Sequence, residues 1–319
     1  MHNLINELLL AKLNNPILKE LADSARINYS QQLAFTTDSF VVNPLYFPGG
    51  DIGKLAVCGT VNDLVMLGAV PEYLSLGLII EEGLEYSLLE HIVDSIAREA
   101  KKAGVSIVTG DTKVVEKGAV DKVFINTSGI GRIIKGLNLS FGRIRAGDQI
   151  IATGRIGQHG LAVLSKRKEM SMGLNIKSDC ASLSGLLVPI LKRTKAIKFM
   201  RDPTRGGVAT TLNEIAQGAG LGIKIVEQNI PVSHQVRAAG ELLGIDPLYI
   251  ANEGIAIVVV ERNSAEKVLK LLKRHPLGKY AKIIGEVTKK PKGKVVLETT
   301  VGTERIIDML ASDPLPRIC

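Results

Sequence analysis

The sequence predicts an α/β protein of the α+β type, with two domains that each pack helices against a mixed sheet. The chain has 319 residues, more than one typical domain contains. Its hydrophobic content is 45%, enough to bury a sizeable core. Short apolar segments of β type alternate with amphipathic helical segments in both halves. We expect an N-terminal domain over residues 1–145, a C-terminal domain over residues 146–305 and a tail over residues 306–319.

The N-terminal half shows this alternation most clearly. Residues 33–42 and 73–80 are apolar and β-like, whereas residues 52–67 have helical spacing. A further helical stripe ends at Gly104, which is expected to cap it before a strand over residues 105–109. That stripe consists of Leu88, Leu89, Ile92, Ile96 and Ala100.

The pattern restarts near Gly147 and Asp148, after a polar stretch over residues 140–145 that marks the domain junction. A strand over residues 149–153 opens the second half. Further strands are expected at residues 222–227, 254–260, 281–287 and 294–299, and helices at residues 208–217, 236–243 and 264–274.

The chain ends in a segment that cannot form a regular helix. Pro314 and Pro316 remove backbone donors and disfavour helix at the residues before them, so the end is expected to be extended. Eight extended residues reach up to about 26 Å. The tail could therefore carry its last side chain into a neighbouring cleft.

Composition argues against a nucleic-acid partner and against a membrane protein. The formal charge is +8, but the basic residues are scattered and aromatic residues make up 4% with no Trp. Lys267 and Lys270 fit a solvated helix face. The longest apolar runs, such as residues 74–80, are far shorter than the roughly 18–20 residues that span a bilayer.

The three cysteines match neither a zinc site nor a disulfide framework, which favours a reducing cytoplasm. Cys58 and Cys180 stand among apolar or small neighbours and are interpreted as packing residues. Cys319 ends the tail and is interpreted as a mobile carrier thiol. Its thiolate would be favoured by Arg317 and opposed by the adjacent terminal carboxylate.

Four aspartates stand in turn-like settings after apolar strands or at helix starts: Asp38, Asp51, Asp63 and Asp111. Carboxylates that converge on one sheet edge could hold magnesium together with substrate phosphates. Each could equally satisfy free backbone N–H groups as a helix cap or a turn residue, and Asp51 directly precedes a helix.

Further candidates carry positive charge or a base. Lys113 shares a strand face with Asp111 and could bind a phosphate or form a surface ion pair. Arg205 precedes two glycines at a helix start, which suits an anion or a simple cap. Glu253 precedes a glycine at a strand start and could act as a general base or be an exposed turn residue.

Two histidines complete the candidates. His159 follows a glycine turn that lacks the dinucleotide spacing, so we expect only a polar contact there. His234 opens a helix and is expected on the surface.

Taken together, these motifs resemble the HypE family of hydrogenase maturation proteins along essentially the whole chain. The resemblance rests on residues 50–57, 59–64, 110–115, 201–207, 248–254 and 316–319. It implies a fold shared with aminoimidazole ribonucleotide synthetase and selenophosphate synthetase. It also implies a homodimer that forms through the N-terminal domain, with ATP bound at the edge of that domain.

The resemblance further implies a reaction, in which ATP drives dehydration of an S-carbamoyl group on Cys319 to S-cyanide for the iron of nickel-iron hydrogenase. Lys113 would stabilise charge and Glu253 would take a proton. Magnesium would lie on Asp38, Asp63 and Asp111, and ATP would contact those residues together with Asp51, Asn62, Thr112 and Arg205. The implied partners are the carbamoyltransferase HypF and the HypC and HypD acceptors.

Two alternatives stay open, a non-catalytic scaffold that docks through its tail and another ATP-dependent enzyme of the same fold. Members of the family usually begin with a His-Gly and Gly-Gly segment that folds over the nucleotide. This sequence begins at Met1-His2-Asn3-Leu4, so that lid is expected to be missing or replaced.

Overall fold

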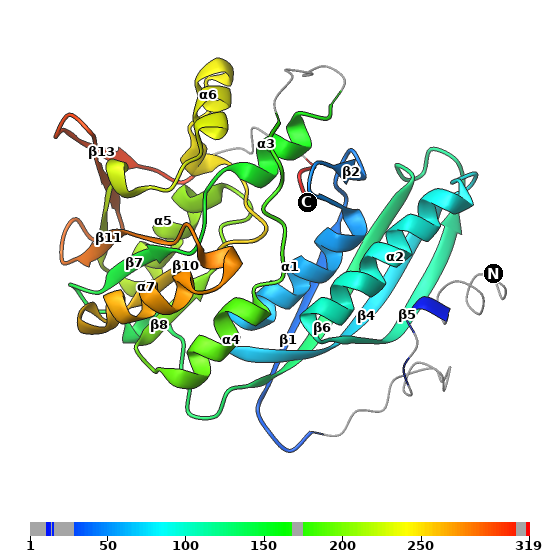
Figure 1. Cartoon of the computed structure of the whole chain (residues 1–319), viewed down its shortest axis with the longest axis horizontal. Coiled ribbons are helices and arrows are strands. Elements are labelled where there is room, and N and C mark those ends of the chain that lie inside the picture. Colours follow the sequence, from blue (N-terminus) through cyan, green and yellow to red (C-terminus); the bar gives the residue numbers. More distant parts are fainter. Residues whose placement is uncertain (1–10, 14, 16–28, 168–174, 311–316) are drawn as a thin grey trace.

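The computed structural model describes residues 11–13, 15, 29–167, 175–310 and 317–319. The predictions on the N-terminal lid and on the tail prolines fall on residues outside these ranges. Two sheets with helices packed against them form the molecule (Figure 1), which confirms the predicted fold class. No helix of the described residues is both long and apolar enough to cross a bilayer.

The N-terminal sheet has the strand order β1-β6-β4-β5. Strands β4 and β5 run parallel, and the other neighbours are antiparallel. A two-stranded ribbon, β2 (Tyr46–Phe47) with β3 (Gly50–Asp51), follows β1. The four strands of the sheet are β1 (Leu33–Phe40), β4 (Ala69–Glu81), β5 (Ser106–Val115) and β6 (Val123–Ile133).

Helices α1 (Ile52–Met66) and α2 (Tyr86–Ala103) cover one face of this sheet (Figure 1). Helix α2 buries a single stripe and ends at Gly104 in the left-handed conformation, with φ of 74°, as predicted. Helix α1 is different, because all of its residues except Lys54 and Asp63 are buried.

The C-terminal sheet has the order β13-β12-β9-β11-β7-β10-β8, in which β12 and β9 are parallel. Its strands are β7 (Gln149–Ala152), β8 (Ile197–Arg201), β9 (Gly222–Val226), β10 (Ile257–Val260), β11 (Lys282–Thr288), β12 (Val295–Glu298) and β13 (Glu304–Ile307). Its helices are α3 (Gln158–Leu164), α4 (Ser184–Arg193), α5 (Gly207–Ala219), α6 (His234–Leu243) and α7 (Ala265–Lys273).

Strand β10, next to the edge strand β8, is buried on both faces. Ile257 and Val259 pack in the cluster that contains α5, whereas Val258 and Val260 pack in the cluster of α4 and α7. Helices therefore cover both sides of this sheet, which explains why the strand is an unbroken β-branched run.

The second of these clusters continues into the N-terminal domain. Helix α4 contacts both α1 and β4, so the two domains share one apolar core. A shared core fixes the relative position of the domains, and the groups at their junction are held in place by it.

Several elements were missed by the pattern analysis. Strand β6 is rich in Gly, Asn, Ser and Thr, which weakens the β signal. Its Gly129 has a packing reason, because a Cβ there would lie 2.8 Å from the Thr60 side chain of α1. The other missed elements are α4, β8 and β13.

Two predicted boundaries also change. The predicted strand over residues 105–109 continues to Val115, because its parallel pairing with β4 persists that far. Strand β13 ends at Ile307, beyond the predicted start of the tail at residue 306. We propose that the domain boundary lies at residues 145–146, between the two sheets.

One loop contact within the C-terminal domain leaves no room for a side chain. A Cβ on Gly254 would lie 1.8 Å from the backbone oxygen of Asp179. The Gly254→Ala variant should therefore lose about 1–3 kcal/mol of stability through overpacking. Thermal unfolding measures the loss, which corresponds to about 2–4 °C per kcal/mol for a chain of this size.

Gly142→Ala is the matched control, because a Cβ at Gly142 meets nothing within 4 Å. Its free energy of unfolding should change by no more than about 0.5 kcal/mol, so its melting temperature should stay close to that of the wild type. Equal losses in the two variants would contradict the argument from close approach.

Candidate functional site

A cavity of about 170 Å³ lies where the two domains and the C-terminal residue meet. The N-terminal domain contributes Asp38 from β1 and Asp63 from α1, and the segment before β10 contributes Glu253. These three, with Arg205 and Cys319, were all predicted as site residues. The full lining is Asp38, Gly59, Asp63, Asp202, Thr204, Arg205, Glu253 and Cys319.

The tail reaches this cavity by pairing with the segment after β1. The Val41 N–H donates to the Cys319 carbonyl at 3.2 Å, and the Asn43 N–H donates to the Arg317 carbonyl at 3.2 Å. Arg167 donates to the Arg317 carbonyl at 3.1 Å as well. The last residues thus form a short antiparallel ladder beside β2 and α3 (Figure 1).

The side chain of Arg317 contacts the N-terminal domain, and its support of the Cys319 thiolate stays a prediction. Its guanidinium donates to the Val41 carbonyl at 3.0 Å and to the Asp121 carboxylate at 2.9 Å. It also lies 5.8 Å from the centre of the Phe124 ring. Arg317 therefore anchors the tail to the N-terminal domain.

The side chain of Ile318 points into the protein. It is 4% exposed and belongs to the core cluster that joins the two domains. Burying such a side chain stabilises the docked tail by about 1.5–3 kcal/mol. Hydrophobic burial and the ladder together hold Cys319 at the cavity.

His159 makes a more specific contact than the polar contact predicted from sequence. The ring is fully buried at the start of α3, and its Nε2 lies 2.9 Å from the Ile318 carbonyl. Its Nδ1 lies 2.8 Å from the Ser178 hydroxyl. Burial lowers the pKa of His159 to about 4, so the imidazole is neutral at physiological pH. His234 is exposed at the start of α6, as predicted.

Four carboxyl groups crowd the cavity, and each has a raised pKa. Burial and then the charge of Asp63 raise the pKa of Asp202 to about 7. Burial raises the pKa of Asp63, and burial with the charge of Asp63 raises that of Asp38. Burial, followed by the charges of three neighbouring aspartates, raises the pKa of Glu253 well above its ordinary value. The cavity therefore favours protons or other cations.

Asp202 was not predicted as a site residue, although it belongs to the same motif as Arg205. Its neighbour Pro203 accepts a hydrogen bond at 3.1 Å from the buried Asn252 side chain. Asn252 also accepts from the Gly157 N–H at 2.7 Å. This amide joins the segment of Asp202 to the segment of Glu253, which explains why both face one cavity.

Glu253 is positioned through its backbone. Asp179 accepts hydrogen bonds from the N–H groups of Glu253 at 3.0 Å and Gly254 at 2.8 Å. Burial raises the pKa of Asp179 to about 6 despite these bonds. The segments of Asp179 and Glu253 can come this close only because residue 254 is a glycine. In the sequence, Gly254 stood out only as part of a motif.

Arg205 is exposed and contributes a positive charge that opposes the raised pKa of Asp38. Gly206 and Gly207 follow it at the start of α5, with φ of 71° and 60°. A Cβ on Gly207 would lie 2.6 Å from the Leu248 carbonyl. The glycines therefore serve the close packing of this turn and leave Thr204 and Arg205 at the cavity.

Two predicted ligands of ATP have structural contacts instead. Asp51 caps α1 by accepting from the Lys54 N–H at 2.9 Å, and its other oxygen accepts from the Ser95 hydroxyl at 2.6 Å. Asn62 donates to the Ala181 carbonyl at 3.1 Å and accepts from the Leu183 N–H at 2.8 Å. Neither residue lines the cavity. The capping alternative holds for Asp51, and Asn62 ties α1 to the C-terminal domain.

Asp111, Thr112 and Lys113 also lie outside the cavity lining. The sequence had suggested that they follow the end of a strand. In the structure they lie within the continuous strand β5. Asp111 and Lys113 share a face, are about two-thirds exposed and form an ion pair at 3.1 Å. Among the described residues no group of three His, Cys, Asp or Glu side chains is placed to hold a metal, so the three predicted metal ligands do not converge in one chain.

The two remaining cysteines are buried in the shared core, as predicted for packing residues. A hydrogen bond with Cys58, then burial, raises the pKa of Cys180 well above its ordinary value. The Cys180 thiol therefore stays protonated and unreactive at neutral pH.

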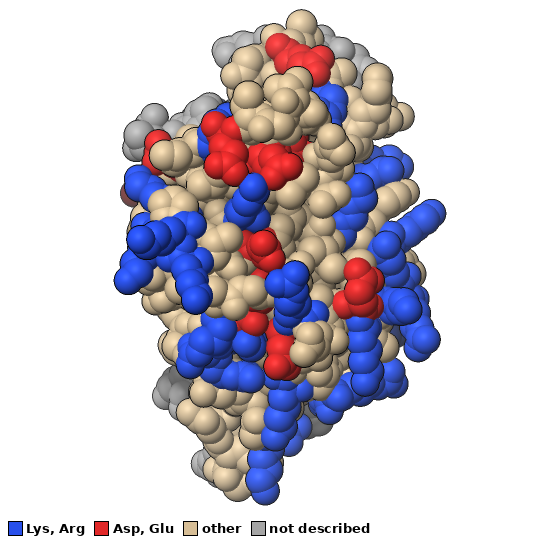
Figure 2. Space-filling model, turned by 90° about the vertical axis from the view of Figure 1, so that its left-hand side faces the viewer, with Lys and Arg blue, Asp and Glu red and all other residues tan. Residues whose placement is uncertain are grey.

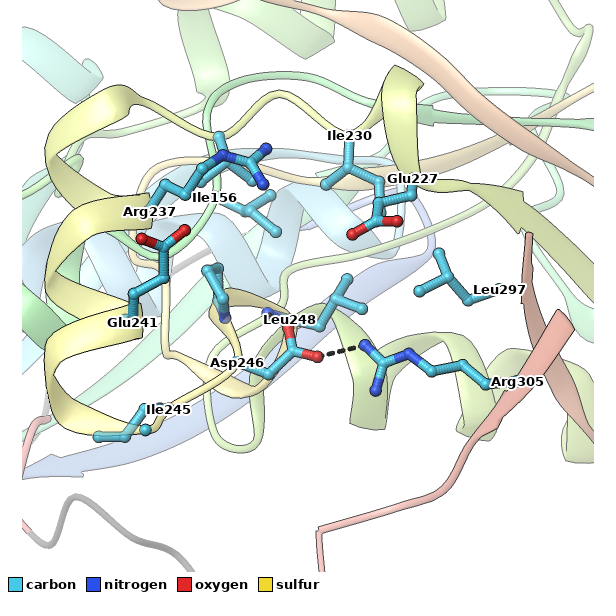
Figure 3. Close-up of a pocket in the computed structure, with 14 residues that line it drawn as sticks. Ile156, Glu227, Ile230, Arg237, Glu241, Ile245, Asp246, Leu248, Leu297 and Arg305 are labelled. Carbon is cyan, nitrogen blue, oxygen red and sulfur yellow. Dashed lines mark hydrogen bonds and ion pairs between the residues drawn. The ribbon is translucent and has the colours of Figure 1, made fainter. Parts of the chain in front are cut away.

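A larger cavity of about 300 Å³ lies in the C-terminal domain between α6 and the β12–β13 edge (Figure 3). Its floor is apolar, and Asp246 and Arg305 form an ion pair at its side. It contains none of the predicted site residues. We place the candidate site in the smaller cavity because the thiol, the carboxyl groups and an arginine meet there.

The distribution of charged side chains on the surface agrees with the scattered positions of the basic residues in the sequence. Figure 2 shows the side of the C-terminal domain, where acidic side chains lie among the basic ones. Lys224, for example, pairs with both Glu298 and Glu304 at 2.8 Å. On this face the lysines and arginines do not form a surface of one sign.

Comparison with known proteins agrees with this architecture. The profile of the AIR synthase related protein N-terminal domain matches residues 21–133, and that of the C-terminal domain matches residues 145–298. The carbamoyl dehydratase HypE of Escherichia coli (strain K12) is 47% identical over 325 residues, which cover 100% of this chain and 96% of the relative.

Solved structures give the same result. The crystal structure of hydrogenase maturation protein HypE in complex with ATP superposes with a TM-score of 0.96 at 47% identity, covering 100% of this chain and 96% of that one. A HypE chain from the crystal structure of a HypE-HypF complex superposes with a TM-score of 0.85 at 50% identity, covering 96% and 99%. With both domain profiles matched and nearly half of all residues identical over its full length, the chain belongs to the HypE family of hydrogenase maturation proteins.

Proposed function

We propose that this protein is an ATP-dependent dehydratase that converts an S-carbamoyl group on its own Cys319 to an S-cyanide. The proposal rests on the position of Cys319, which lines one cavity together with Glu253, Asp202 and Arg205. The tail holds the terminal residue among acid, base and cationic groups, as a substrate would be held. Its relatives bear the name carbamoyl dehydratase, and one was solved with ATP.

The proposed reaction balances without a redox partner. The carbamoyl oxygen attacks the γ-phosphorus of ATP, and the bond to ADP breaks. Loss of two N–H protons and cleavage of the C–O bond then leave the S-bound carbon triply bonded to nitrogen. The products are the S-cyanide, ADP, phosphate and a proton, so the oxygen of the amide leaves as phosphate.

Glu253 is the proposed base for these protons. The raised pKa of Glu253 favours its protonated form, and the carboxyl group must lose its proton before it can act as a base. A cation near Asp202, Asp38 and Asp63 would lower that pKa by offsetting their charges. Arg205, which lines the same cavity, could meet the phosphate that the reaction forms.

Magnesium fits these residues if phosphate oxygens complete its ligands. Asp38 and Asp63 face one cavity, and the charge of Asp63 contributes to the raised pKa of Asp38. Magnesium is usually bound by one or two carboxylates with waters and substrate phosphates, so a complete protein site is not required. When bound there, the ion would neutralise phosphate charge.

The crowding of carboxyl groups predicts a stability that depends on pH. In the folded protein Asp202 has a pKa of about 7, above its ordinary value of 3.8, so folding favours its protonated form. The free energy of unfolding falls as the pH rises from the ordinary pKa of Asp202 to its pKa in the folded protein. The loss has reached its full size above pH 7. Asp202→Asn removes that loss. Without ATP or magnesium, its melting temperature should exceed that of the wild type by roughly 4 °C at pH 8.

The difference should shrink toward zero near pH 4, because both proteins then carry a neutral side chain. Asp308→Asn changes an exposed carboxylate and should shift the melting temperature little at either pH. A gain for Asp202→Asn that is larger at pH 4 than at pH 8 would contradict this assignment.

The proposed roles of Asp111, Thr112 and Lys113 require a second copy of the chain, since these residues lie outside the cavity of their own chain. The sheet that carries them exposes Phe35, Ile79 and Val114 as large apolar side chains. Such a face favours association, and we propose a homodimer through it. Lys113 of one copy would then stabilise charge at the group carried by Cys319 of the other copy.

Mixing two inactive variants tests this arrangement. Lys113→Ala and Cys319→Ala should each be inactive alone. Mixed dimers purified through two different tags should recover about half of the wild-type activity, because one of their two sites is complete. If the mixed dimer stays inactive although it forms, Lys113 acts within its own chain or not at all.

The proposed partners follow from the chemistry of the tail. The carbamoyltransferase HypF would load Cys319, and a HypC-HypD complex would accept the cyanide. A solved HypE-HypF complex supports the first partner. The reactive terminal thiol and two reduced buried cysteines suit the cytoplasm, where we place the protein.

Intact-protein mass spectrometry is the decisive experiment. After incubation with HypF, carbamoyl phosphate and ATP, the wild type should gain a carbamoyl group and then lose the mass of one water. Cys319→Ala should gain nothing. Glu253→Gln should be loaded normally but lose water about 10²–10⁴-fold more slowly, as expected when a general base is removed. A wild type that is never loaded would favour a scaffold or another ATP-dependent enzyme of this fold.

A further inference from the structure

The contact between His159 and the tail is buried and directional. The Nε2 atom lies 2.9 Å from the carbonyl oxygen of Ile318, the last peptide carbonyl before Cys319. The ring packs edge-on against Phe47, with 5.2 Å between ring centres. The imidazole is thereby held in one orientation at the end of the tail.

The hydrogen bonds of His159 fix which ring nitrogen carries the proton. The Ser178 hydroxyl oxygen accepts from the Cys180 N–H at 3.0 Å. Because the Ile318 carbonyl can only accept, Nε2 must carry the hydrogen of the neutral ring, and the Ser178 hydroxyl donates to Nδ1, 2.8 Å away. A neutral ring that accepts at Nδ1 carries its hydrogen on Nε2, so His159 donates to the Ile318 carbonyl.

Among the described tail contacts, only the buried Ile318 side chain besides His159 resists a shift of the tail, because the backbone and Arg317 contacts do not set a register by themselves. The ladder with Val41 and Asn43 uses backbone groups, which repeat every two residues along a strand. The Arg317 side chain is long and partly exposed, so it can follow a shifted tail. A shift would leave the buried Nε2–H without its acceptor, which is costly in the interior.

We propose that His159 is the positioning residue that sets the register of the tail and orients the Ile318–Cys319 peptide, so that the group carried by Cys319 faces Glu253. The inference rests on the proposed function of Cys319 as carrier. Since the carbonyl and the next N–H share one rigid peptide plane, holding the Ile318 carbonyl also fixes the Cα of Cys319, and the Val41 N–H holds the carbonyl on the other side of that Cα. His159 itself touches neither the carbamoyl group nor the cavity lining.

Two amide variants separate the donor from the ring. In His159→Gln the amide nitrogen reaches the position of Nε2, so a donor to Ile318 remains. In His159→Asn the amide ends at the position of Nδ1 and cannot reach the tail. Both lose the ring packed against Phe47, so they are matched in lost packing.

Loading of Cys319 by HypF and loss of water with MgATP are measured separately by intact mass. Loading requires the tail to leave the cavity, so no variant should be loaded more slowly than the wild type. Dehydration should be about 100-fold slower in His159→Asn, the loss expected from a displacement of about 1 Å. His159→Gln should recover most of that loss. A His159→Asn protein that loses water at the wild-type rate overturns the proposal.

A second readout does not depend on the reaction. Iodoacetamide should alkylate Cys319 faster in His159→Asn than in the wild type or His159→Gln, while the buried Cys58 and Cys180 stay unmodified. Equal alkylation rates in all three proteins would also overturn the proposal. If the wild type is loaded but never loses water, the proposed function fails while this comparison still tests the positioning.

Ser178→Ala covers the case in which His159→Asn does not fold. It keeps the ring and removes only the hydroxyl that donates to Nδ1, so loading should stay normal while dehydration falls about tenfold through partial misplacement. Unchanged dehydration in Ser178→Ala, with a normal melting temperature, would overturn the claim that the orientation of the His159 ring controls dehydration.

Discussion

The packing of helix α1 between the two domains is the constraint on which the rest of the structure depends. Its backbone start is fixed by the Asp51 cap, and its residues are buried against α2, the N-terminal sheet and α4 of the other domain. Asn62 adds hydrogen bonds to the C-terminal domain at its inner end. Since Asp63 is one of only two residues of this helix that are not buried, the same packing that joins the domains presents its carboxylate to the cavity.

A site at such a junction brings like charges together. The carboxyl groups of Asp38, Asp63, Asp202 and Glu253 come from four segments. Burial raises the pKa of each, and repulsion by neighbouring carboxylates adds to the rise for Asp38, Asp202 and Glu253. The shared core supplies the stability that this crowding consumes. Crowded carboxyl groups favour a cationic ligand and a raised proton affinity, which are properties a phosphoryl-transfer and proton-abstraction site requires.

The tail completes the site by ordinary strand pairing and burial of one side chain. Backbone pairing with Val41 and Asn43 can form and break at little cost, whereas the buried Ile318 and the contact with His159 make one docked position preferable. A carrier thiol needs both properties, because it must leave the cavity to be loaded and return to one defined position.

Sequence reasoning located much of the site because its signals are local. Gly104 as a helix cap, the glycines after Arg205 and a cysteine that ends a proline-containing tail depend on conformations that a few residues determine. Strand β6 was missed because its small and polar residues are selected by contact with α1, which is distant in sequence. The sequence could not separate the two readings of Asp51, because a capping carboxylate and a ligand stand in the same local pattern.

The sequence by itself thus determined the two-domain α/β class, the family and most candidate residues: Cys319, Asp38, Asp63, Arg205 and Glu253. Only the tertiary structure decided which of them meet. It moved Asp51 and Asn62 into structural contacts, left Asp111 and Lys113 on the outer surface, added Asp202 and gave His159 its contact with the tail. Proximity between residues about 160 positions apart, such as His159 and Ile318, depends on how buried surfaces pack, and no local pattern encodes that packing.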